Sequence, residues 1–156
     1  MQTTITVRIS SLFFLLSFLF VSCQTKIITN FNKYENLSLA DKKEVNQYLE
    51  EAKKSISKKE DEIILMFQYN CFFDKVLDVN GKFTESFPQK ENTIHYGQKF
   101  INFSKSIGNI SITQSDGKRI VIPQKEGYDY ISICYYNKGD KFFIHYYDFP
   151  KLLIVE

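Results

Sequence analysis

The spacing of apolar positions changes twice along the chain, and each change marks a different kind of structure. Residues 12–23 form an almost unbroken apolar block, Leu-Phe-Phe-Leu-Leu-Ser-Phe-Leu-Phe-Val-Ser-Cys. Further along, four apolar residues recur at the spacing of one helix face, namely Val45, Leu49, Ala52 and Ile56. After that stretch the apolar residues alternate or run continuously, as they do in strands. The pattern predicts an apolar leader, one helix and a β region.

The helix is expected over residues 38–58. Ser38-Leu39-Ala40-Asp41 resembles a capping box, in which the serine oxygen accepts a backbone N–H of the first turn and an acid three residues later reaches back. The polar face carries charges of both signs, and Glu50 precedes Lys54 by four residues, the favourable order for an ion pair. A narrow apolar face with mixed charges favours a helix packed on a sheet over a helix that lies on a membrane.

The β region is expected to contain three hairpins and two further strands. The hairpin turns are Asn80-Gly81, Asp116-Gly117 and Lys138-Gly139, which separate 75–79 from 82–87, 109–114 from 118–122, and 128–137 from 140–148. A long buried strand is expected at 63–73 and another strand at 100–104. The chain is therefore expected to be mainly β: an antiparallel β-sandwich, or a single curved antiparallel sheet, with one N-terminal α-helix packed on it. An α+β arrangement is the alternative.

The first residues have the order of an export signal. A free amino terminus and Arg8 precede the apolar block, and the small residues Ser22 and Cys23 end it. A membrane-spanning helix needs about 20 apolar residues, and the polar run Gln24-Thr25-Lys26 ends this block sooner. The segment is therefore expected to be a signal peptide.

The end of this signal, Phe20-Val21-Ser22-Cys23, resembles the lipobox of bacterial lipoproteins. In that family a cysteine after a small residue is alkylated by diacylglycerol and becomes the first mature residue; Phe20 departs from the usual Leu. The resemblance implies a signal peptide over residues 1–22, lipid on Cys23, and anchoring to a membrane of the cell envelope, facing the periplasm or the cell surface. It ends at Cys23 and implies no fold or activity. The alternative is ordinary cleavage after Cys23, which would give a secreted protein.

The remaining chain is expected to form a lipid-anchored tether and one domain. Residues 23–37 show no clean period and are rich in Asn and Lys, so we expect a tether, with a short strand at Ile27-Ile28 as the alternative. Residues 38–156 are expected to form a single globular domain. Removal of residues 1–22 from the 156-residue chain leaves 134, an ordinary size for one domain.

The charge balance narrows the class of possible partners. The chain has 20 basic and 18 acidic side chains, and the loss of Arg8 with the signal leaves 19 basic ones. This balance argues against nucleic acid, whose binding requires a basic surface.

Once Cys23 carries lipid, Cys71 and Cys134 remain as an even pair and as a candidate disulfide in an oxidising compartment. Two buried thiols that act as small hydrophobic side chains are the alternative.

The last hairpin determines which side chains share a face. With a turn at Lys138-Gly139, one side carries the expected core residues Ile131, Ile133, Tyr135, Phe142, Ile144 and Tyr146. The other side is amphipathic and aromatic, and its candidate binding face consists of Tyr130, Tyr136, Phe143, His145 and Tyr147. We expect Tyr136 and Tyr147, near opposite ends of the hairpin, to stay partly exposed.

A catalytic site at this face is a weaker hypothesis than a binding surface. Cys134 and His145 are diagonal neighbours, about 7–8 Å apart by backbone position, so a thiol nucleophile and its base are conceivable. Such a pair needs contact within about 3 Å and a group that orients the imidazole, and the sequence offers no evident oxyanion loop. His95 and His145 each lack a second ligand at metal spacing, so neither a metal nor another cofactor is expected.

These features favour a lipid-anchored binding module of the envelope without enzymatic activity. Its partners would be the membrane, through the lipid on Cys23, and a protein, peptide or glycan on an aromatic face. An immunity or inhibitor protein against an incoming toxin is one form of such a module. The alternatives are a small envelope hydrolase or thiol enzyme that uses Cys134 and His145, and a structural subunit of an envelope assembly.

Overall fold

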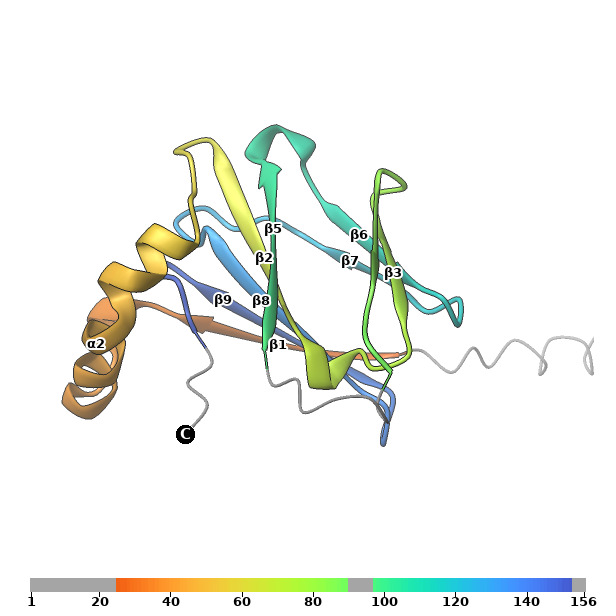
Figure 1. The fold of residues 1–156 in the computed structure, drawn as a ribbon, viewed down its shortest axis with the longest axis horizontal. Coiled ribbons are helices and arrows are strands. Elements are labelled where there is room, and N and C mark those ends of the chain that lie inside the picture. The colour runs from red at the N-terminus through yellow and green to blue at the C-terminus, as the bar shows by residue number, and fades with distance from the viewer. Residues whose placement is uncertain (1–24, 90–96, 153–156) are drawn as a thin grey trace, which may run out of the picture.

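The computed structural model describes residues 25–89 and 97–152, which form two sheets and one long helix (Figure 1). Sheet A has the strand order β1-β9-β8-β2-β5, with bounds Lys26–Asn32, Lys141–Tyr147, Tyr130–Tyr136, Glu62–Gln68 and Gln98–Ser104. Sheet B has the order β4-β3-β6-β7, with bounds Phe83–Ser86, Val76–Val79, Ile110–Gln114 and Arg119–Ile122. The helix α2 spans Leu39–Ser55, and short 3-10 turns lie at Tyr34–Asn36, Tyr69–Cys71 and Lys105–Ile107. The fold is mainly β, a sandwich with one α-helix, as predicted.

Sheet A is mixed because the last hairpin lies between the first two strands. Strands β8 and β9 pair antiparallel, whereas β9 pairs parallel with β1 and β8 pairs parallel with β2. The main core fills the space between the sheets, and its largest fully buried side chains include Phe67, Phe72, Phe142 and Tyr146. Burial of these aromatic side chains is the main force that holds the two sheets together.

The helix begins where the sequence predicts. The Asp41 backbone N–H donates to Ser38 Oγ at 3.1 Å, and the Ser38 hydroxyl donates to the Asp41 carboxylate at 2.6 Å. The helix ends at Ser55, earlier than expected, and Ile56 then packs with residues of sheet A. The helix and the segment Phe149–Leu152 cover one end of the outer face of sheet A.

The turns form where the sequence predicts, and the last hairpin has the predicted register. Asn80 and Gly81 have φ of 57° and 65°, the positive values that a type I′ turn requires. In the last hairpin Tyr136 pairs with Lys141 and Tyr130 with Tyr147, so the two predicted faces are correct. The turn residues alone were therefore enough to predict the register of the last hairpin.

Two segments differ from the prediction. The strand expected at 63–73 ends at Gln68, because the chain turns there and buries Phe72 between the sheets. The segment expected to be a tether contains β1, a seven-residue strand of sheet A rather than a short strand at Ile27-Ile28. The ordered domain therefore begins before Ser38, and only two residues separate Cys23 from Lys26. The signal and Cys23 lie outside the described residues.

Candidate binding surface

One end of the predicted aromatic face packs against the helix region and the C-terminal segment. Tyr130 is 8% exposed and packs with Ile56, Ile64 and Met66. Tyr147 contacts Phe149 with ring centroids 5.4 Å apart, and burial raises its pKa. Tyr130 is buried there, whereas Tyr147 is only partly buried and so stays partly exposed, as predicted.

The other half of the face is more open. Tyr136 is 50% exposed, as predicted, and it lies beside the turn of the last hairpin. Phe143 and His145 are partly buried, and the His145 ring stacks on Tyr147 with centroids 6.3 Å apart. Burial lowers the pKa of His145 below its usual value. The predicted face is thus divided, and only its turn end presents an aromatic side chain freely.

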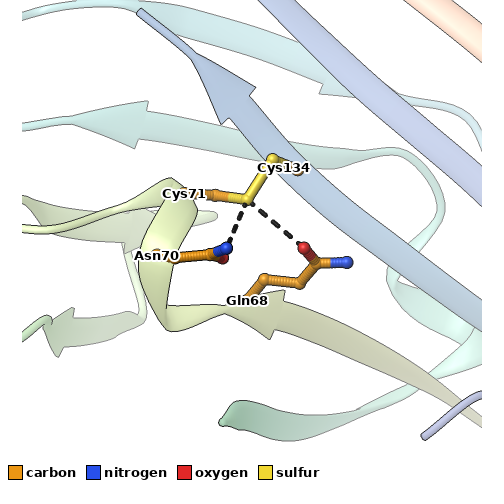
Figure 2. The surroundings of a disulfide bond; sticks show 4 residues. All are labelled: Gln68, Asn70, Cys71 and Cys134. Atoms are coloured by element: carbon orange, nitrogen blue, oxygen red, sulfur yellow. Dashed lines mark hydrogen bonds between the residues drawn. A yellow bond between two sulfur atoms is a disulfide. The ribbon is translucent and has the colours of Figure 1, made fainter. Parts of the chain in front are cut away.

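Cys71 and Cys134 form a disulfide (Figure 2). Their Cα atoms are 5.1 Å apart, and Cys71 lies in a 3-10 turn rather than in the strand expected for it. The side-chain amides of Gln68 and Asn70 approach Cys71 Sγ at 3.5 Å. Because a disulfide sulfur carries no proton, these are polar contacts in which sulfur cannot donate. Cys134 has no free thiol, so it cannot act as a nucleophile beside His145.

Strand β1 provides a surface that the sequence analysis missed. The Lys26 N–H donates to the Asp140 carbonyl of the last hairpin at 3.0 Å. Backbone groups of successive strand residues point to opposite sides, so those of Ile27, Thr29 and Phe31 face the free edge of the sheet. Ile27 and Phe31 are 46% and 50% exposed. We call these three residues the β1 ledge.

The ledge is open because sheet B is narrower than sheet A. Hydrogen bonds join the residues at both ends of β7 to the β8–β9 hairpin, which lies beside β1. Lys118 Nζ donates to Tyr135 OH at 2.6 Å, and Tyr146 OH donates to the Pro123 carbonyl at 2.7 Å. Sheet A has five strands and sheet B four, and the side chains of Ile27 and Phe31 on β1 stay half exposed. Phe31 stacks on Tyr146 at 4.9 Å, which fixes its ring on the ledge.

The edge of β1 also lacks the charges that normally protect an edge strand. Proteins often place charged residues on edge strands, because unpaired backbone groups invite another strand. The other described edge strands carry Lys99, Glu85 and Arg119 in β5, β4 and β7. From Ile27 to Asn32, β1 carries none. It is therefore the edge best suited to accept a strand.

The charged clusters of the described residues have structural partners. Asp129 accepts from Lys58 and Lys105, each at 2.8 Å, at the start of β8. Burial alone would raise the pKa of Asp129, but the two lysines outweigh it and lower that pKa. In the part of the chain that the structure describes, no three His, Cys, Asp or Glu side chains gather as a metal site would require. The same part contains no helix long and apolar enough to cross a membrane.

Comparison with protein-family models, curated proteins and solved structures finds no match for this chain. The fold and its surfaces therefore define the class on their own: a disulfide-linked β-sandwich with one open edge strand that carries no charge after Lys26.

Proposed function

We propose that the chain is a lipid-anchored binding module of the cell envelope that captures an extended segment of a partner protein as a strand beside β1. The observation that carries the proposal is the uncharged edge of β1 with Ile27 and Phe31 half exposed. Strand addition gains affinity from main-chain hydrogen bonds and specificity from alternate side chains. The lipobox-like sequence before Cys23 supports the anchor.

The ledge defines the chemistry of the partner segment. The partner would be an extended, uncharged segment with apolar side chains at alternate positions, because two of the three ledge side chains are apolar and are separated by Thr29. An immunity or inhibitor protein that blocks an exposed strand of a toxin is one form of this function. The thiol-enzyme alternative lacks support because Cys134 is in a disulfide.

The test is Thr29→Pro in the mature chain. Proline removes the outward N–H of this exposed residue and projects its ring toward an incoming strand, but leaves the β9 ladder intact. Thr29→Val is the matched control, because it keeps the N–H. We expect capture of a partner from solubilised envelope to fall at least about tenfold for Thr29→Pro, given a lost hydrogen bond and a steric clash. Quantitative mass spectrometry of captured proteins measures the change.

A second variant separates the ledge from the predicted aromatic face. Tyr136→Ser alters the exposed end of that face and leaves the ledge unchanged. We expect it to capture the same proteins as the wild type. If Tyr136→Ser loses the partner and Thr29→Pro keeps it, with unchanged thermal midpoints, the ledge is not the binding site.

A further inference from the structure

The first described residues are attached to one end of the sandwich. Strand β1 begins at the end opposite α2, beside the turn between β8 and β9 (Figure 1). Thr25 Oγ1 donates to Asp140 Oδ2 at 3.3 Å, and the Lys26 N–H donates to the Asp140 carbonyl at 3.0 Å. The position of Thr25 relative to the domain is therefore fixed.

A lipid on Cys23 would leave almost no tether. Cys23 precedes Thr25 by two residues, and two extended residues span at most about 7 Å. The acyl chains must lie in the bilayer, so this end of the sandwich would be held against the lipid headgroups. A tether as long as residues 23–37 would have let the domain rotate freely, but β1 and the 3-10 turn at Tyr34–Asn36 belong to that segment, and β1 begins at Lys26.

The side chains at this end suit an anionic surface. Tyr136, Lys141 and Lys26 form a row across β8, β9 and β1 on the outer face of sheet A. Lys138 projects from the adjoining turn and is exposed. No carboxylate in residues 25–89 or 97–152 pairs with these three lysines. Tyr136 is half exposed, and tyrosine is enriched where bilayers meet water.

Acidic groups at the same end are mostly neutralised. Asp140 pairs with Lys118 at 3.3 Å, and Asp116 pairs with Lys75 at 2.6 Å. The three unpaired lysines therefore leave a net positive rim.

We propose that the rim formed by Lys26, Lys138, Lys141 and Tyr136 rests on the headgroups of an anionic phospholipid bilayer. This inference rests on the proposed lipid anchor at Cys23. The lysines attract the lipid phosphates and Tyr136 enters the interface, because its ring is apolar and its hydroxyl is polar. The β1 ledge then extends away from the membrane toward α2, where a partner can reach it.

The test is a lysine footprint of the acylated chain in vesicles. The protein is reconstituted in phosphatidylcholine alone or with phosphatidylglycerol, treated with a water-soluble amine-acylating reagent, and analysed lysine by lysine by mass spectrometry. Lys26, Lys138 and Lys141 should react severalfold more slowly in the anionic vesicles, and salt should reduce that protection. Exposed Lys43 and Lys54 of α2 are internal controls and should react equally in both.

Two triple variants with equal charge change test the cause. Lys26→Gln/Lys138→Gln/Lys141→Gln should weaken docking about fivefold per lysine, seen as faster hydrogen exchange of the β8–β9 turn in anionic vesicles. Lys43→Gln/Lys54→Gln/Lys125→Gln should leave that exchange unchanged. Equal reactivity of the rim and of α2 in an acylated chain would overturn the docking inference alone. An intact mass without acyl chains would overturn both the anchor and the docking.

Discussion

Loss of the disulfide is expected to destabilise the domain strongly, because the bridge closes a long loop. Cys71 and Cys134 are 63 residues apart, and the loop between them contains every strand of sheet B. In the chain-entropy model a loop of this length lowers the entropy of the unfolded chain enough to contribute about 4 kcal/mol at room temperature. A domain of this size has about 5–15 kcal/mol in total. Cys71→Ala/Cys134→Ala should therefore stay folded with a small remaining margin.

Urea unfolding followed by far-ultraviolet circular dichroism measures this loss, since the chain has no Trp for fluorescence. With a slope of about 2 kcal/mol per molar urea, the midpoint should fall by about 2 M. Each single variant breaks the same bridge, so each should cost nearly as much as the double variant and the effects should not add. Reduced wild type should behave similarly. A double variant within about 1 kcal/mol of the oxidised wild type would refute the loop argument.

Two further substitutions test buried polar groups. Burial lowers the pKa of His145, so the unfolded chain binds a proton first as the pH falls and stability declines below about pH 6.5. His145→Phe should reduce the fall of the urea midpoint between about pH 7 and pH 5, and an unchanged slope would contradict this cause. Gln114 is 2% exposed, and neither atom of its side-chain amide has a protein partner among the described residues. Gln114→Met should stabilise the domain by about 1–3 kcal/mol in thermal unfolding. The control Thr113→Val, on the outer side of the same strand, should change the stability little. A lower thermal midpoint for Gln114→Met would argue against an uncompensated amide.

The parts of the fold that depend on neighbouring residues could be predicted from the sequence. The cap at Ser38 and the turn at Asn80-Gly81 each depend on a few adjacent side chains. The register of β8 and β9 followed from one turn. Once Cys23 was assigned to lipid, Cys71 and Cys134 remained as a candidate disulfide, with two buried thiols as the alternative, and the structure shows the disulfide.

Long-range contacts determine the parts that could not be predicted. Strand β1 pairs parallel with β9, and Thr25 contacts Asp140 across 115 residues of chain. The spacing of apolar residues in β1 does not predict a strand, because the strand depends on pairing with β9, which lies near the other end of the sequence. The register of the last hairpin likewise showed that Tyr130 and Tyr147 share a face. It left open whether the helix would cover that face or leave it as a binding surface, and it did not predict that the segment after Pro150 would pack there.

The short anchor proposed at Cys23 would also affect the specificity of the β1 ledge. An unprotected edge strand pairs most readily with another copy of itself, and an antiparallel pair of β1 strands is the simplest two-fold arrangement. Such a pair would place the two copies of Lys26 at opposite ends of a seven-residue strand, about 20 Å apart. If both domains rest on the same bilayer through the lysine rim, each Cys23 must lie within about 7 Å of its own Thr25. One copy would have to leave the membrane, so the proposed anchoring would disfavour self-pairing and keep the ledge open for a different partner.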